Sequence, residues 1–344
     1  MKKSLFLAAL ATIALASCTQ NELTIERQEI GFSPLQYKAV NSKTIITGNK
    51  YPSGLPFGLY AYHTDGTNNN LYINNATCSY DATAKTFVSN PVAYWPLSGT
   101  LGMVAWSPKT IAATYTLDGK KMSISFEAVG RETEPVDLMY SIPLTGLTKD
   151  NQTVGYEAKE DNVVDGGNGV GITFKHALSQ IVVTAKVADT YTGAVYNITG
   201  LSLQSMDDNN TLNVTENANP AASWGTASVK TATFSIFSGT SDDLDTEEEN
   251  VGSAVLVIPQ ALVANQQKLV VNYQMTYNGV TTSTSRDVYL NSGTSPLTAL
   301  AMGKKYTLNL TLYADRILYS PSIEEDWSVG GSSYDVPEQP AAGN

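Results

Sequence analysis

Apolar and polar residues alternate one by one along much of this chain, and a period of two restricts those segments to β-strands. The alternation is clearest in residues 269–277 and in residues 306–312. Asn278 and Gly279 follow the first of these, and both tolerate the positive φ of a two-residue hairpin turn, so we expect residues 280–290 to run back beside it. Beyond the first seventeen residues, no segment of ten or more keeps a helical period. The sequence therefore predicts an all-β fold.

The length of 344 residues favours two domains over one. Residues 157–171 are polar and then glycine-rich, so they form the best linker candidate between two halves of similar size. Two β-sandwiches in tandem fit this division. The predicted boundaries are a signal peptide at 1–17, an N-terminal sandwich at 18–160, a C-terminal sandwich at 161–329 and a polar tail at 330–344.

The start of the chain has the pattern of a bacterial lipoprotein export signal. Lys2 and Lys3 precede a short apolar stretch at residues 5–15, which is too short for a stable membrane span. Leu-Ala-Ser-Cys follows at residues 15–18, and the Cys18 thiol is the expected attachment point for lipid. Several acyl chains would hold the protein firmly on a membrane, since each buried methylene contributes about 0.8 kcal/mol. A plain secretory peptide with an accidental cysteine is the alternative.

The inventory of reactive side chains argues against an enzyme. The chain has two histidines, His63 and His176, and Cys78 is its one cysteine besides Cys18. A zinc site needs a cluster of such ligands, and neither a nucleophile elbow nor a phosphate-binding glycine loop occurs. We therefore expect no catalytic residue, no metal and no cofactor, although paired carboxylates of a hydrolase would leave no motif. The net charge of −11 argues against nucleic acid as a partner.

One local irregularity involves His176. Ile172 and Phe174 alternate in one phase, and the residues from Ile181 onward alternate in the other. A strand cannot keep one face inward across such a slip, so a bulge or a turn is expected near His176. A buried histidine with a backbone hydrogen-bond partner is favoured there over a functional one.

The densest acidic run, residues 242–249, has two interpretations. Carboxylates are the ligands that calcium prefers, but the spacing lacks the glycine and glutamate of an EF-hand loop. Blocks of like charge usually stay in water, so a solvated loop is favoured.

Eight short segments stand out in order along the chain: FGLYAY (57–62), YWPLSG (94–99), MVAWSP (103–108), DLMYS (137–141), FKHALSQ (174–180), IPQ (258–260), GKKYT (303–307) and IEEDW (323–327). They are spread over most of the mature chain. Together with the lipoprotein signal, these segments and their order resemble the Bacteroidetes fimbrillin family.

The resemblance implies two transthyretin-like β-sandwiches and a subunit of surface fimbriae that assembles by strand donation, for adhesion. It implies other fimbrial subunits as partners, the outer membrane as the anchor and a host or bacterial surface receptor. Residues 29–37 would be a placeholder strand, with Ile30, Phe32 and Leu35 pointing into a groove of the first sandwich. Such polymerisation is head-to-tail and gives a filament.

In the family a trypsin-like protease releases the placeholder by cutting after a basic residue. Lys38, Lys43 and Lys50 are the candidates, and Lys43 lies nearest to the place where the family tends to carry arginine. Ordinary surface lysines are the alternative for each.

The resemblance places the donor strand in residues 317–327. Ile317, Tyr319, Ile323 and Trp327 are the candidate groove-filling residues. Stalk subunits of the family end close to that tryptophan, whereas this chain continues to residue 344, which leaves stalk, tip and accessory roles open. A surface glycan-binding lipoprotein for polysaccharide uptake is the competing function, since the chain's 19 tyrosines and four tryptophans could stack on sugars.

Overall fold

The protein is described by a computed structural model that covers residues 27–36, 51–128, 136–152, 169–188, 193–226, 230–293 and 296–324. These residues form strands and turns, so the predicted all-β fold class is confirmed. Within the described ranges, no helix is long and apolar enough to cross a membrane.

The largest sheet contains eight strands. They are β1 (Gly31–Gln36), β2 (Phe57–Thr64), β3 (Asn69–Asp81), β4 (Thr86–Asn90), β5 (Thr100–Ser107), β8 (Met139–Ser141), β9 (Leu144–Leu147) and β10 (Val170–His176). They follow the order β2-β3-β4-β1-β10-β8-β5-β9, and β5 also pairs with β2. The sheet therefore closes on itself as a ring, and β1 lies in that ring between β4 and β10.

The interior of this ring is a hydrophobic core of its own. Inward-facing residues from β1, β2, β3, β4, β5 and β10 form a single buried cluster. Its largest members are Trp95, Tyr51 and the four phenylalanines Phe32, Phe57, Phe87 and Phe174. Since alternate residues of a strand face opposite sides, the ring encloses one residue of every two.

A second sheet combines strands from both halves of the sequence. Its strands are β6 (Ala113–Thr116), β7 (Lys121–Glu127), β13 (Asn209–Thr215) and β14 (Ala222–Trp224). The β13–β14 hairpin adds to β7, and Met122, Ile124 and Phe126 pack in one cluster with Tyr60 and Trp106 from the outer face of the ring. Strand β2 is consequently buried on both faces, which explains its continuous apolar run.

The remaining strands form a sandwich. One sheet contains β11 (Ser179–Val187), β16 (Glu249–Asn250), β17 (Val255–Val257), β22 (Lys305–Leu312) and β23 (Ile317–Glu324). The other contains β12 (Ala194–Met206), β15 (Ala232–Ser238), β19 (Lys268–Tyr277) and β20 (Val280–Tyr289). Inward residues of both sheets belong to one cluster, and β18 (Gln260–Ala261) pairs with β21 (Ala299–Leu300) beside them.

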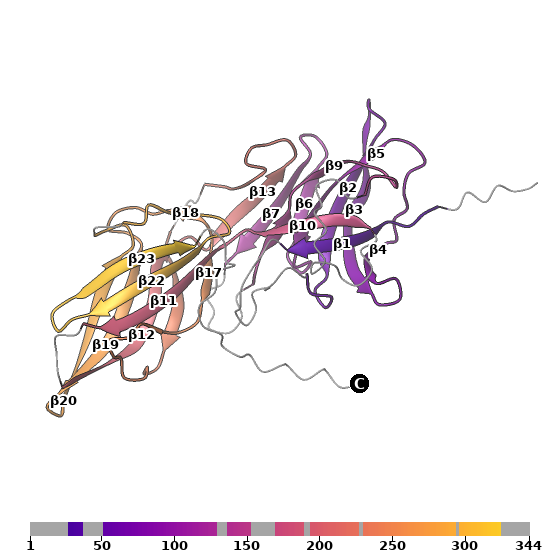
Figure 1. Ribbon diagram of the computed structural model, residues 1–344. Helices are drawn as coiled ribbons and strands as arrows, with labels where there is room; N and C mark the ends of the chain where they lie inside the picture. The colour runs from indigo at the N-terminus through magenta and orange to yellow at the C-terminus, as the bar shows by residue number, and fades with distance from the viewer. Residues whose placement is uncertain are drawn as a thin grey trace, which may run out of the picture.

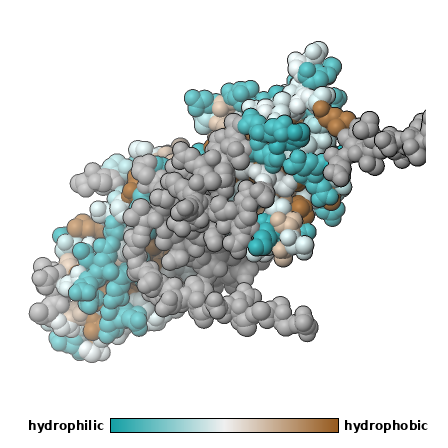
Figure 2. All heavy atoms as spheres, turned by 45° about the vertical axis from the view of Figure 1, so that its right-hand side comes forward, coloured by the Kyte–Doolittle hydropathy of each residue, from teal (hydrophilic) through white to brown (hydrophobic). Residues whose placement is uncertain are grey.

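Strands β1 to β5 and β10 gather at one end of an elongated molecule, and β19, β20, β22 and β23 lie at the other (Figure 1). Strands β7 and β13 lie between the two ends. On the face shown in Figure 2, most of the described surface is hydrophilic and the apolar residues form small separate patches.

The chain leaves the ring for the sandwich after residue 176, which is later than the boundary predicted at residues 160 and 161. Strand β10 belongs to the ring, whereas β11 belongs to the sandwich. The predicted linker at 157–171 overlaps the first two residues of β10. The glycine-rich pattern of the linker could not show that the next strand, β10, pairs with β1 in the ring, because the two strands are distant in the sequence. We propose that the boundary lies at Ala177 and Leu178.

Candidate strand-exchange groove

Strand β1 is held on both sides by backbone pairing. It runs parallel to β10, from Phe32 opposite Val170 to Gln36 opposite Phe174. It runs antiparallel to β4 over Gly31 and Phe32 only. The Thr86 hydroxyl donates a 2.8 Å hydrogen bond to the Phe32 carbonyl oxygen. The strand therefore fills a gap between two other strands rather than extending an outer edge.

The side chains of β1 complete the ring's core. Ile30 and Phe32 are 1% and 0% exposed, and Pro34 is also buried. The Phe32 ring meets Phe57 edge-on at a centroid distance of 6.3 Å. Behind Phe57, Tyr51 stacks on Phe174 at 5.0 Å. Without β1, this aromatic cluster would face an open slot.

Loss of β1 would expose unpaired backbone groups and apolar surface at the same place. The facing edges of β4 and β10 would present unpaired backbone N–H and C=O groups, and an apolar slot would open between them. We call this slot, lined by β4, β10 and the Phe57 cluster, the groove. Such a site favours an extended strand with apolar residues at every second position.

Strand β23 has a different setting. Among the described strands it is the last of its sheet and pairs with β22 alone, antiparallel, from Ile317 opposite Leu312 to Glu324 opposite Lys305. Ile317 and Tyr319 are only partly buried, and Ile323 is 52% exposed. Lys305 Nζ and Glu324 Oε1 form an ion pair of 2.9 Å. This strand therefore lies at an accessible edge.

Several predicted site residues lie outside the described residues. They are the lipidation residue Cys18, the cleavage candidates Lys38, Lys43 and Lys50, and the donor residue Trp327. The backbone of Leu35 lies in β1 opposite Thr173, but its side chain is also outside the described part. The predicted role of each of these residues stays a prediction.

His176 lies at the end of β10, just before the chain crosses to the sandwich. It is buried, as predicted, and one partner is a side chain: Nδ1 lies 2.9–3.0 Å from the two carboxylate oxygens of Asp137. Both side chains are at most 3% exposed. The pair joins β10 to the segment before β8. Sequence spacing could not have identified Asp137, which lies in another segment.

Cys78, on β3, is fully buried in the ring's core. Burial raises the pKa of its thiol far above the usual range, with a small opposing contribution from the charge of Lys109. The thiol therefore stays protonated at neutral pH and has no contact with solvent.

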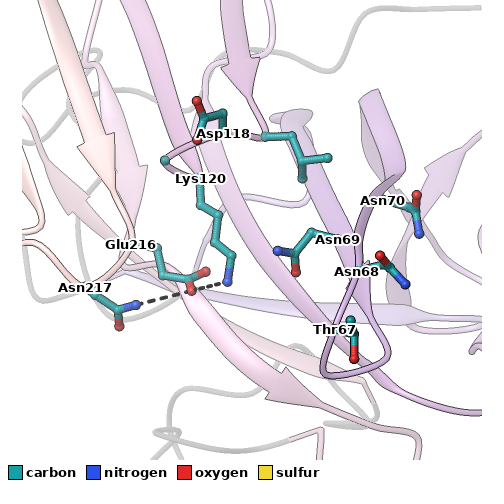
Figure 3. A pocket seen from close by; sticks show the side chains of 10 residues that line it. Thr67, Asn68, Asn69, Asn70, Asp118, Lys120, Glu216 and Asn217 are labelled. Atoms are coloured by element: carbon teal, nitrogen blue, oxygen red, sulfur yellow. Dashed lines mark hydrogen bonds and ion pairs between the residues drawn. The ribbon is translucent and has the colours of Figure 1, made fainter.

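A hydrophilic pocket of about 810 Å³ lies where turns from three sheet regions meet (Figure 3). Lys120 Nζ contacts Glu216 Oε1 at 2.8 Å and donates to the Tyr62 hydroxyl at 2.7 Å, and that hydroxyl donates to Glu216 Oε2 at 2.6 Å. Burial and the bond to Glu216 raise the pKa of Tyr62. Burial lowers the pKa of Lys120, but its bonds to Glu216 and Tyr62 outweigh that effect and raise it overall. This network links the ring to the β7 and β13 turns.

None of the pocket's lining residues is aromatic. Apart from Leu117 and Gly119, the lining consists of asparagine, threonine and charged side chains, with Asn68, Asn69 and Asn217 among them (Figure 3). A flat glycan-binding platform would need two or three exposed aromatic rings on one face. The pocket therefore gives the glycan-binding interpretation no support.

The acidic run at 242–249 is bonded to neighbouring strands. Leu244 is buried and forms a bridge with Tyr196, and the Asp243 carboxylate accepts a 2.9 Å hydrogen bond from Asn197. The described ranges contain no group of three or more metal-ligating side chains.

Sequence reasoning missed two features that position the groove. One is β10 as the parallel partner of β1, and the other is the β13–β14 hairpin that crosses from the C-terminal half to β7. Both are pairings between distant segments, and alternation identifies a strand without identifying its neighbour.

The chain matches known proteins at the level of family and fold. A family model described as fimbrillin-like matches residues 44–327. No curated protein matches the chain in sequence.

Two solved structures share the fold. One is a fimbrial protein from Bacteroides vulgatus, with a TM-score of 0.57 and 16% identity over 87% of this chain and 99% of that one. The other is a protein from Bacteroides uniformis proposed to act in cell adhesion, with a TM-score of 0.52 and 17% identity over 87% and 98%. Since the family model spans most of the sequence, the chain belongs to the fimbrillin-like family and is a structural subunit rather than an enzyme.

Proposed function

We propose that this chain is a subunit of a surface fimbrium that serves adhesion and assembles by strand exchange. In this proposal β1 is a placeholder that a protease removes. The groove between β4 and β10 is then filled by the C-terminal segment, residues 317–327, of a neighbouring subunit. Repetition of this step gives a head-to-tail filament.

The observation that carries the proposal is the position of β1. It lies between two strands of a closed ring, its Ile30 and Phe32 are fully buried, and its removal would expose unpaired backbone on both sides. An exposed groove of this kind takes up a foreign strand, because main-chain hydrogen bonds supply affinity and side-chain pockets supply specificity.

The cleavage site must lie between the end of β1 at Gln36 and Tyr51, whose ring is 1% exposed in the core. Lys38, Lys43 and Lys50 all fall in this interval. The family match begins at residue 44, directly after Lys43. This coincidence favours Lys43, since a segment that is removed from the mature subunit need not be shared across the family.

The lipid is proposed to attach at Cys18, on the N-terminal side of β1. A cut after Lys43 would leave β1 and the outer-membrane anchor on the same fragment, so departure of that fragment would free the subunit and open the groove together. Release and activation would be a single event, so unprocessed subunits would stay anchored and monomeric.

The test uses a chain that begins at Thr19, which lacks the lipidated cysteine. Limited trypsin treatment should remove the N-terminal segment and produce oligomers that sizing chromatography and negative-stain microscopy detect. The matched control replaces Lys38, Lys43 and Lys50 with glutamine, and it should keep β1 joined to the ring and stay monomeric. Complete cleavage with loss of β1 and no oligomer would refute the proposal.

A further inference from the structure

Two strands at opposite ends of the chain carry closely similar sequences. Residues 30–34 read IGFSP and include the start of β1, and residues 317–321 read ILYSP and begin β23. The isoleucine, serine and proline are identical, and an aromatic residue stands at the third position of both. We propose that β23 of a second copy of this chain replaces β1 in the groove in the register that this likeness defines.

In this register Ile317 takes the place of Ile30, Tyr319 that of Phe32 and Pro321 that of Pro34. All three replaced residues are buried, and the serine between the last two, Ser33, is buried as well and is matched by Ser320. The one non-conservative difference is Leu318 in place of Gly31, and it falls in the other alternation phase, away from the core. The proposal rests on the proposed function and adds to it the partner's identity and the exact pairing.

The shared proline restricts the alternatives further. Proline has no N–H group to donate, so it fits a strand only where that donor is not needed. Pro34 lies beyond the last residue of β1 that pairs with β4, and it has only β10 beside it. Pro321 arrives at this same position in the proposed register. A shift by one residue would reverse every side chain, and a shift by two would bring Pro321 opposite Phe87.

The shared order of the residues fixes the direction of the donated strand. Ile317 to Pro321 would run parallel to β10 and antiparallel to β4, as β1 does. In its own sheet β23 runs antiparallel to β22. The donor must therefore leave β22 before it enters the groove.

Backbone pairing is nearly balanced in this exchange. Strand β23 gives up eight paired positions with β22, and in the groove it gains the five that β1 makes with β10 and the two that it makes with β4. The free energy that favours the exchange must therefore come mainly from side-chain burial. Ile317 and Tyr319 are partly buried in the sandwich but would be fully buried in the groove. Burial of apolar surface stabilises by about 25 cal/mol per Å².

The Tyr319 hydroxyl is poorly satisfied in its own sheet. The hydroxyl is buried and has no hydrogen-bond partner among the described residues, and burial raises its pKa far above the usual range. Release of β23 therefore breaks no hydrogen bond of this hydroxyl among the described residues.

The register can be tested by disulfide trapping between two chains. Gly31 lies directly opposite Val88 on β4, so in the proposed complex Leu318 of one copy lies opposite Val88 of the other. Opposed Cα atoms in an antiparallel pair are about 4.5–5.5 Å apart, which suits a disulfide. One chain would carry Leu318→Cys and the other Val88→Cys. The two would be mixed, cleaved with trypsin and oxidised.

The matched control pairs Ser320→Cys with Val88→Cys. Ser320 lies two residues further along the strand, about 6.6 Å away, which places its Cα too far from Val88 for a bridge. The proposal predicts at least a tenfold excess of the cross-linked heterodimer for Leu318 over Ser320, with the linkage identified by peptide mapping.

The outcomes separate this proposal from the proposed function. Oligomers in which Ser320 cross-links as well as Leu318, or instead of it, would overturn the register and leave strand exchange intact. Absence of oligomers after cleavage of the unmodified chain would overturn both. If a cysteine variant fails to fold, Tyr319→Phe and Tyr319→Ser give a second test. The phenylalanine variant should assemble like the parent and the serine variant at least tenfold more slowly, and equal rates would refute the register.

Discussion

Truncation of Phe32 to alanine should destabilise the uncut protein and have no effect once β1 is gone. The Phe32 side chain is 0% exposed and packs on Phe57, so its removal leaves a cavity that the rigid ring cannot fill. Phenylalanine-to-alanine changes at such sites cost about 3–5 kcal/mol. Because Phe32 belongs to β1, we expect the lost free energy to weaken the binding of β1 between β4 and β10 before it affects the rest of the ring.

The magnitude can be followed through the release of β1 after the cut. Once trypsin has cut between Gln36 and Tyr51, β1 is held by its backbone pairing and by the packing of residues such as Phe32. A loss of about 3 kcal/mol weakens that docking roughly 100-fold, and such losses appear mostly in the dissociation rate. We therefore expect the cut N-terminal segment of Phe32→Ala to leave about two orders of magnitude faster, in a time course analysed by sizing chromatography and mass spectrometry.

The matched control is Phe57→Ala, since Phe57 is equally buried but stays in the subunit after cleavage. It should lower the free energy of unfolding, measured with urea, both before and after the cut. Phe32→Ala should lower it only before the cut. A Phe32 variant that releases the cut segment at the parental rate would show that Phe32 does not hold β1 in the groove and would refute the reasoning.

Three further predictions concern groups outside β1. The Cys78 thiol should resist a thiol reagent such as DTNB in the folded uncut protein and react fully in urea, since it is buried and its pKa is raised; rapid reaction of the native protein would contradict this. Asp137→Ala should lower the free energy of unfolding by about 1–3 kcal/mol in urea titrations, because His176 loses a buried partner; an unchanged value would show that the pair is dispensable. Lys120→Ala should cost less than about 1 kcal/mol by the same measurement, since the lysine side chain of its ion pair with Glu216 is 27% exposed; a larger loss would indicate that the network holds the sheets together.

The local features of the fold could be predicted from the sequence. The hairpin around Asn278 and Gly279 forms as predicted, with φ of 50° and 76° at the two turn residues and strands at Lys268–Tyr277 and Val280–Tyr289. The alternation at residues 306–312 gives a strand with its apolar residues buried. Both depend on neighbours within a few residues, which is the range over which periodicity and turn chemistry act.

The partners of the strands could not be predicted in this way. The phase slip near His176 marked a real change, since β10 ends there and β11 begins a new sheet, but nothing local showed that β10 pairs with β1. The groove depends on that pairing. The segment that fills it was identified through family resemblance, because the few residues of β1 show too little alternation to define a strand alone.

The most direct measurement is a cryo-electron microscopy structure of filaments grown from the cleaved chain. The account predicts a strand between β4 and β10 that is continuous with the C-terminal half of a neighbouring subunit, with Tyr319 beside Phe57. A groove that still holds the subunit's own β1, or direct pairing of β4 with β10, would contradict it.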